Sequence, residues 1–154
     1  MKKTIFIAFM LVAAQIFSGC GDEKAENKPV QKVEKEKFDL SNAKDGIYTV
    51  ESSRDEKLGK SVLTLTIQDK KIIDAEFKGY DLFGNEKDET YGEILGKDSA
   101  DYKKAQVAVK AIQTYPKQLV ETQDLNQVDA ISGATVSHGQ FVETTKKAIA
   151  ESKK

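Results

Sequence analysis

Residues 61–77 read SVLTLTIQDKKIIDAEF, and this stretch decides the fold. Apolar and polar residues alternate over residues 61–67 and again over residues 72–77, with a short polar turn between the two runs. The side chains expected on the buried face are Leu63, Leu65 and Ile67 in the first run and Ile73, Ala75 and Phe77 in the second. Two runs of period two joined by a short turn predict an antiparallel hairpin with one buried face.

The chain before the hairpin predicts one more strand. Asp45 and Gly46 form a turn signal, and a short strand is expected near residues 47–51. Residues 52–60 are polar and read as a loop, as do the glycine-containing residues 79–97 after the hairpin.

Helices are expected in the second half of the chain. Ser99 is a plausible N-cap for a helix over about residues 100–114, which Tyr115-Pro116 should end because the residue before proline disfavours the α region. Pro116 can then open a second short helix over residues 117–122, and a last helix should run over about residues 136–152. Strands followed by helices predict an α+β fold, a small antiparallel sheet with helices packed on one side.

Composition excludes several classes of function. The chain has 154 residues, a net charge of −1, one cysteine and one histidine. The length predicts one domain, and the balanced charge gives no reason to expect nucleic acid as a partner. A single cysteine excludes an intramolecular disulfide, and a metal site built on several His or Cys ligands is excluded as well.

The N-terminus has the order of an export signal. Residues 1–19 begin with two lysines, continue with an apolar run over residues 5–14, and end in small residues before Cys20. A lone cysteine at this place resembles a bacterial lipobox, although Phe17 stands where leucine is usual. The resemblance implies removal of residues 1–19 and a lipid anchor on Cys20 at the extracytoplasmic face of a bacterial membrane. The alternative is an ordinary secretory peptide with an incidental cysteine.

A charged spacer follows the cysteine. Residues 21–44 hold many lysines and glutamates and few apolar groups, so they cannot bury enough surface to offset the entropy of ordering. The expected organisation is therefore a signal peptide over residues 1–19, a lipidated and flexible tether over residues 20–44, and one folded domain over residues 45–154.

The segment that carries the chemistry is DAISGATVS, residues 129–137. It reads as a glycine-containing turn that opens into the last helix. Backbone N–H groups at a helix start lack intrahelical partners and favour a phosphate group. The small residues Ser132, Gly133 and Ala134 let a bulky group approach the backbone, and Thr135 places a hydroxyl at that point. The alternative is that Ser132 or Thr135 is only an N-cap.

This segment resembles the flavinylation motif of the FMN-binding domain family, which includes the flavin-bearing subunits of the Rnf and Nqr redox complexes and extracellular electron-transfer lipoproteins. Further similar positions are Asp45 to Tyr48, Ile72 to Asp74, Lys87 to Glu89, Tyr91-Gly92 and Phe141. Together they span residues 45–152.

The resemblance implies a cofactor and its partners. In the family an ApbE-type transferase moves FMN from FAD to a threonine hydroxyl, and the matching residue is Thr135. Asp129 would serve recognition by the transferase, and Ser132, Gly133 and Ala134 would shape the turn. Ser137 is counted with the cofactor-binding residues.

Other side chains allow two interpretations each. His138 stands where many relatives have Ser or Thr, and it either tunes the flavin or faces solvent on the helix. Tyr91 is placed among the flavin contacts as a ring that stacks on the cofactor, a role that Tyr80 or Phe83 could fill instead, and packing is the alternative. The charged run Lys87-Asp88-Glu89 could line the flavin pocket, but the interpretation preferred here is a solvated face, as is usual for a run of charges.

Three functions follow from these expectations. The first is an electron carrier with covalent FMN that exchanges electrons with donor and acceptor proteins and has no substrate of its own. The second is a surface lipoprotein that binds a small ligand or a partner and carries no covalent flavin. The third, a flavin reductase, lacks support because no nucleophile–base pair and no nicotinamide-binding glycine pattern is present.

Overall fold

The computed structural model describes residues 39–154. The expected signal peptide, Cys20 and most of the charged spacer lie outside these residues.

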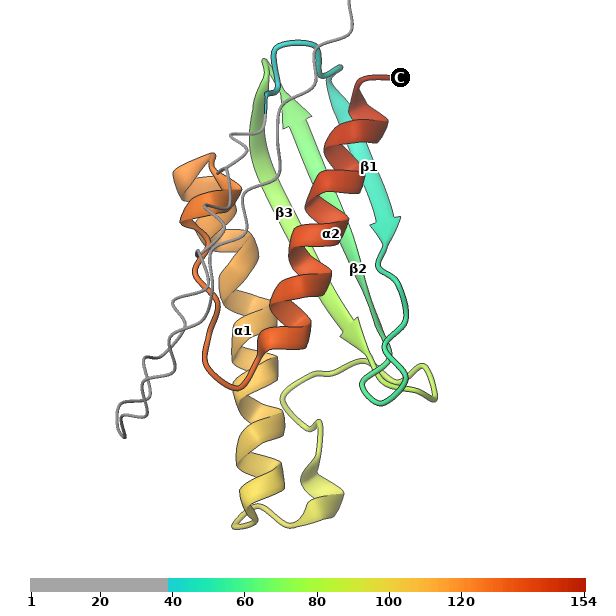
Figure 1. Ribbon diagram of the computed structural model, residues 1–154, viewed down its shortest axis with the longest axis vertical. Helices are drawn as coiled ribbons and strands as arrows, with labels where there is room; N and C mark the ends of the chain where they lie inside the picture. The colour runs from blue at the N-terminus through green and yellow to red at the C-terminus, as the bar shows by residue number, and fades with distance from the viewer. Residues whose placement is uncertain (1–38) are drawn as a thin grey trace, which may run out of the picture. The chain divides into compact units, whose positions relative to one another are not determined.

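The sheet contains three antiparallel strands in the order β1-β2-β3. They are β1 (Gly46–Glu51), β2 (Lys60–Gln68) and β3 (Lys71–Tyr80). Leu63, Leu65 and Ile67 on β2 are buried, as their alternation predicts. The predicted hairpin is confirmed, and β1 adds to its β2 edge (Figure 1).

The second strand of the hairpin contains a bulge that the sequence pattern did not reveal. Ile67 pairs with Ile72, while the preceding Thr66 pairs with Asp74, so Ile73 is an extra residue on β3. An inserted residue shifts the alternation by one position. Ile72 is therefore buried and Ile73 is 50% exposed, and the prediction that Ile73 faces the core is wrong.

The first helix is longer than predicted. α1 (Ala100–Thr122) begins after Ser99, whose side chain accepts a hydrogen bond of 3.0 Å from Tyr102 N as predicted. The helix continues through Pro116, so the prediction of two separate helices is wrong. Proline costs one backbone hydrogen bond inside a helix. Here Pro116 and the adjoining Tyr115 are buried, and this tertiary packing outweighs the local preference.

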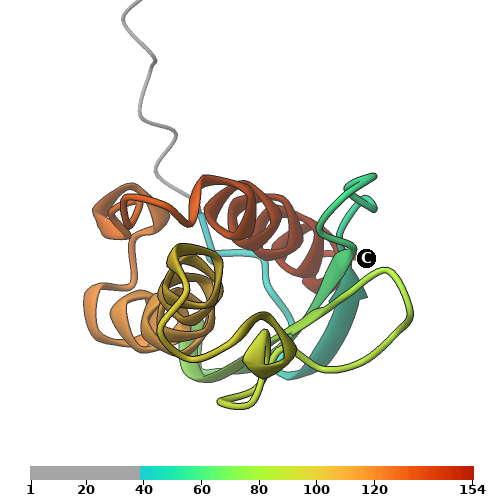
Figure 2. The same ribbon diagram turned by 90° about the horizontal axis from the view of Figure 1, so that it is seen from below.

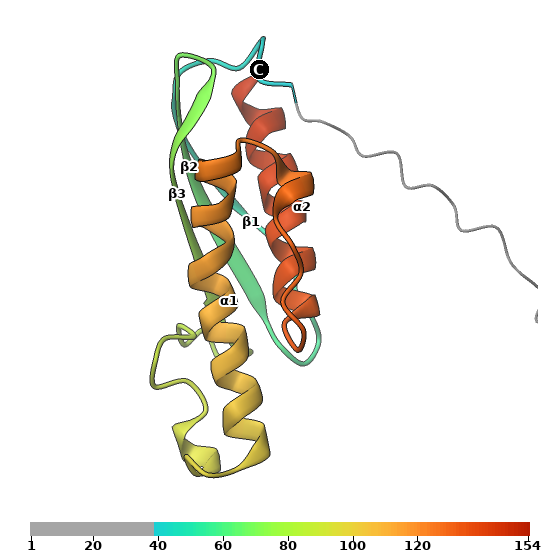
Figure 3. The ribbon, with the colours of Figure 1, turned by 90° about the vertical axis from the view of Figure 1, so that its left-hand side faces the viewer.

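The second helix is α2 (Thr135–Ser152), which begins one residue before the predicted start. α1 contacts β3, and α2 contacts β2 and β1. Both helices lie on the same side of the sheet (Figure 3). Phe141 joins the layers, because its ring lies 5.0 Å from Phe77 on β3 and 5.6 Å from Tyr115 on α1. The α+β architecture is therefore as expected.

Two connections, from β1 to β2 and from β3 to α1, lie at the end of the domain where the helices begin (Figure 1). Residues 81–99 form a loop with one short 3-10 turn, η1 (Glu93–Leu95), and lie across that end (Figure 2). A second 3-10 turn, η2 (Leu125–Gln127), follows α1 and leads to the segment 128–134 before α2.

The packed part of the chain starts earlier than residue 45. Leu40 belongs to the core, Ala43 packs against it, and Lys44 N donates a hydrogen bond of 2.8 Å to Ser152 O. The last residues of the expected spacer therefore belong to the folded domain. Within residues 39–154, neither helix combines the length and the apolarity that crossing a membrane requires.

Candidate functional site

The segment 129–137 forms a tight turn that ends at the first residue of α2. Ala134 N donates to Ile131 O at 2.9 Å, and Gly133 has φ +87°, a conformation that favours glycine. The N-cap residue is Ala134, and no side chain caps this helix start. The alternative that Ser132 or Thr135 serves only as the N-cap is therefore wrong.

Thr135 is exposed on the first turn of α2, and so are Ser132 and Asp129 before it. Within residues 39–154 the Thr135 hydroxyl has no hydrogen-bond partner. The first backbone hydrogen bond of α2 runs from His138 N to Ala134 O. A hydroxyl in this position is open to an incoming group. The neighbouring N–H groups of the first turn carry the positive end of the helix dipole.

Two contacts brace the turn from behind. Ile131 N donates to Tyr115 Oη at 3.1 Å, which ties the motif to α1. His138 Nε2 donates to Val128 O at 2.9 Å, and the His138 ring lies 5.3 Å from the Tyr115 ring, edge to face. His138 is half-buried in these contacts and does not face solvent as the alternative interpretation held. Its position is that of a brace for the turn.

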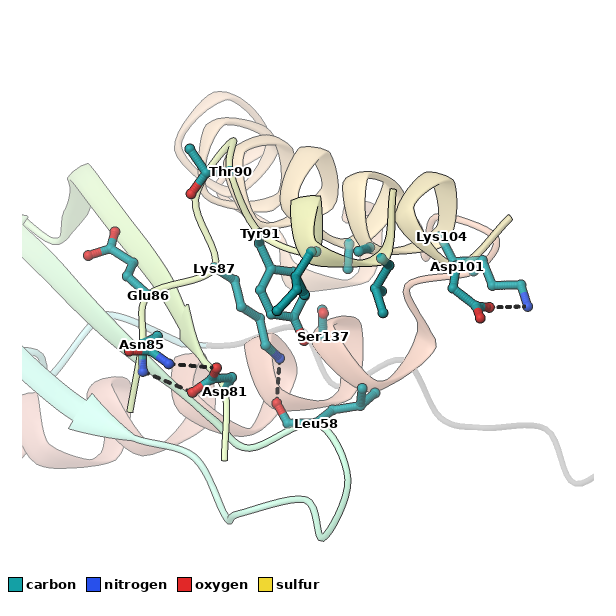
Figure 4. A pocket seen from close by; sticks show the side chains of 16 residues that line it. Leu58, Asp81, Asn85, Glu86, Lys87, Thr90, Tyr91, Asp101, Lys104 and Ser137 are labelled. Carbon is teal, nitrogen blue, oxygen red and sulfur yellow. Dashed lines mark hydrogen bonds and ion pairs between the residues drawn. The ribbon is translucent and has the colours of Figure 1, made fainter. Parts of the chain in front are cut away.

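A cleft of about 680 Å³ opens beside this turn (Figure 4). Gly133 and Ser137 contribute one wall, the beginning of α1 another, and the loop 81–99 the third. Ser137 is 6% exposed. The volume falls in the range of small-molecule sites, roughly 300–1,000 Å³. The motif and the loop, far apart in sequence, therefore meet at one cavity.

Lys87 is the one charged side chain that is buried among the described residues, with 6% of its surface exposed. Its Nζ donates to Leu58 O and lies 5.6 Å from the centre of the Tyr91 ring. Burial lowers the pKa of Lys87, and Asp81 and Asp55 counteract this in part. The interpretation of residues 87–89 as a solvated face is thus wrong for Lys87, whereas Asp88 and Glu89 are exposed.

The three aromatic candidates separate clearly. Tyr91 lines the cleft, and burial raises the pKa of its hydroxyl, with Asp81 adding to the effect. Tyr80 lies at the end of β3 and is not among the residues that line the cleft. Phe83 is 90% exposed in the loop. Of the three, Tyr91 is placed to contact a bound ring.

Some lining residues escaped the sequence analysis. Leu58, Ile94 and Leu95 give the cleft an apolar rim, and Asp81 accepts hydrogen bonds from Asn85 at its edge. Ile94 and Leu95 are exposed apolar residues, which is visible only once the loop has a structure. No spacing in the sequence connected Leu58, before β2, with this loop.

Residues 57–150 match the family model described as the FMN-binding domain. The chain belongs to the FMN-binding domain family. The match covers the three parts that build the walls of the cleft: the loop 81–99, the beginning of α1 and the segment 129–137. The protein is therefore a flavin-binding protein.

Two solved structures are similar to the chain. A crystal structure of a Clostridium perfringens protein is 27% identical, with a TM-score of 0.53, and the match covers 71% of this chain and 88% of that one. A solution structure from Clostridium thermocellum is 23% identical, with a TM-score of 0.41, and the match covers 72% of this chain and 93% of that one. No curated protein matches the chain.

The residues of the site fit FMN. The uncapped helix start can receive a phosphate, and Thr135 stands there as its first residue. Ser137, buried at the wall of the cleft, and Tyr91 offer one hydroxyl and one aromatic face to a planar ring. Lys87 adds a cation to the same cavity.

Proposed function

We propose that this protein is an electron carrier that holds FMN through a phosphoester to Thr135, anchored by a lipid on Cys20 to the extracytoplasmic face of a bacterial membrane. The observation that carries the proposal is the exposed Thr135 hydroxyl on an uncapped helix start, next to a cleft of about 680 Å³. Membership of the FMN-binding domain family supports the choice of cofactor.

Backbone N–H groups at the start of α2 bind the phosphate. The N–H groups of Thr135, Val136 and Ser137 begin α2 without a capping side chain. They can donate to phosphate oxygens, and the helix dipole stabilises the negative charge. The braces from Tyr115 and His138 keep this turn in one conformation, so the acceptor hydroxyl stays where a transferase can reach it.

Attachment needs a transferase of the ApbE type and FAD. The Thr135 oxygen forms a new bond to the phosphorus of the FMN half, the pyrophosphate bond of FAD breaks, and AMP leaves. The hydroxyl proton passes to a base of the transferase. The exposure of Asp129, Ser132 and Thr135 on one turn suits recognition by a second protein.

The bound ring supplies the redox chemistry, and the protein positions it and sets its surroundings. A covalent bond also keeps the cofactor from being lost by diffusion outside the cell. Little noncovalent affinity is then needed, so a shallow and partly open site is sufficient. This is the function of a carrier that meets donor and acceptor proteins.

The test is to produce the full chain in bacteria with and without an ApbE-type transferase and to measure the intact mass. We expect an increase of one FMN minus water that depends on the transferase, and peptide mapping should locate it on the segment 129–137. Membrane fractionation with a Cys20→Ala variant tests the anchor, since that variant should leave the membrane fraction. An unmodified mass in the presence of active transferase overturns the proposal and leaves the surface-lipoprotein alternative.

A further inference from the structure

We propose that the Lys87 ammonium binds the pyrimidine edge of the flavin ring and raises its reduction potential. This inference rests on the proposed function, because it assigns a role inside the same cleft. It starts from the single buried cation of the described residues, which lines the cavity beside the motif turn.

Lys87 has no ion-pair partner in the described part of the chain. Across residues 39–154 no carboxylate is close enough to form an ion pair with its Nζ, and Asp81 and Asp55 act only at longer range. Burying an uncompensated charge is costly. The Lys87 ammonium therefore gains a favourable partner when an electron-rich group enters the cleft.

The Lys87 ammonium also has hydrogen-bond donors that the described residues do not use. An ammonium has three N–H donors. In the described structure one of them goes to Leu58 O, and the Tyr91 ring lies near enough for a cation–π contact. Two donors therefore stay available for a ligand, and the carbonyl oxygens and ring nitrogens of a flavin pyrimidine are acceptors.

The place of Lys87 in the cleft favours the ring of FMN over its phosphate as the binding partner. Thr135 is not among the residues that line the cleft, whereas Gly133 and Ser137 are. A phosphate on Thr135 would thus sit at the helix start, where backbone N–H groups receive it. The ring is the part of the cofactor that has to occupy the cleft, and Lys87 is there.

The consequence is electrostatic. The ring gains negative charge when it takes two electrons and one proton, and a cation in a buried setting stabilises that charge more strongly than it would in water. Lys87 therefore favours the reduced ring over the oxidised one. The electrons come from the donor protein, and the proton comes from solvent water.

The experiment is a spectroelectrochemical titration of the full, flavin-loaded protein with a redox dye as mediator. We expect Lys87→Met to lower the ratio of reduced to oxidised flavin at least tenfold at the wild-type midpoint, which is about 30 mV for a two-electron couple. Lys87→Arg should stay within threefold of wild type because it keeps the charge. Lys103→Met is the matched control and should leave the potential unchanged, since Lys103 is exposed on the first turns of α1 and does not line the cleft.

The outcomes separate the possibilities. A loaded Lys87→Met protein with an unchanged potential overturns the inference and leaves the covalent-carrier proposal intact. Reduced flavin loading with an unchanged potential also overturns it and assigns Lys87 to the phosphate. If Lys87→Met does not fold, Lys87→Gln replaces it in the same titration, and a wild-type chain that takes up no flavin removes both proposals together.

Discussion

The two long helices begin in opposite ways. At α1, Ser99 accepts a hydrogen bond from Tyr102 N, so the helix start is capped by its own sequence. At α2, Ala134 offers no side-chain oxygen, and the first residue, Thr135, keeps its hydroxyl exposed. The cleft lies between these two beginnings, with Asp101 and Ala105 on one side and Gly133 on the other. A capped start serves stability, and an uncapped start leaves its donors for a ligand.

The sharpest way to break this comparison is Thr135→Val. The variant should lose all covalent flavin, because no hydroxyl remains at the helix start, while the free energy of unfolding changes by less than about 0.5 kcal/mol at an exposed site. Flavin fluorescence after denaturing gel electrophoresis and a urea titration measure the two effects. Ser132→Ala, which removes the other exposed hydroxyl of the turn, should keep its flavin. Flavin retained on Thr135→Val would assign the attachment to another residue.

Lys87→Met tests the cleft between the two helix starts in flavin-free protein. Replacing a buried charge that has no ion-pair partner by an apolar side chain of similar length should raise the free energy of unfolding, because burying an uncompensated charge is costly. Burial lowers the pKa of Lys87 in the folded state, so between that pKa and the unfolded value the unfolded chain binds more protons. The free energy of unfolding of the wild-type protein should therefore rise with pH in this window. The difference in free energy of unfolding between Lys87→Met and wild type should become smaller.

Urea titrations of both proteins at several pH values toward 10.5, the ordinary pKa of lysine, measure this gap. A variant less stable than wild type at every pH would mean that the hydrogen bond from Lys87 to Leu58 O outweighs the cost of burial.

Gly133→Ala probes the turn itself. The residue has φ +87°, and a side chain in the left-handed region costs about 1–2 kcal/mol. The new Cβ would lie 3.5 Å from Val107 Cγ1, an ordinary contact, so the loss comes from the backbone. Gly139→Ala is the matched control, because its Cβ meets nothing within 4 Å in α2 and alanine should stabilise the helix. Thermal unfolding compares the two, and equal effects would contradict a strained turn.

Ser99→Ala should have the smallest effect. Removal of the cap hydrogen bond should lower the free energy of unfolding by about 1 kcal/mol and leave flavin loading unchanged. Thr135→Val is the mirror case, with flavin lost and stability kept. If Ser99→Ala reduced flavin loading as strongly as it reduced stability, the functional difference between the two helix starts would disappear.

The sequence predicted what depends on local pattern. Alternation gave the hairpin, Ser99 gave the start of α1, and the segment 129–137 gave a turn opening into a helix. It did not predict the bulge at Ile73, because two adjacent isoleucines satisfy either register and only the pairing with β2 decides between them. It ended α1 too early at Pro116, because the burial that compensates for the lost hydrogen bond is tertiary.

The site divides in the same way. Thr135, Gly133 and Ser137 are close in sequence and were found from the motif. Lys87 was misjudged because a charged run normally lies in solvent, and its burial depends on Tyr91 of its own loop and on Leu58, which comes from the connection between β1 and β2. Residues that act through long-range contacts carry no local signal.

The hydrogen bond from Lys44 N to Ser152 O has a consequence for orientation. It fixes the point where the chain enters the domain beside the last turn of α2 (Figure 1). The helix has 18 residues, so its last turn lies about 27 Å from its first residue, Thr135. A molecule that holds the domain through the residues before Lys44 therefore holds it at the end of α2 that is remote from Thr135. The opposite end, which carries Thr135, can then approach another molecule, and the length of α2 separates it from the point of attachment.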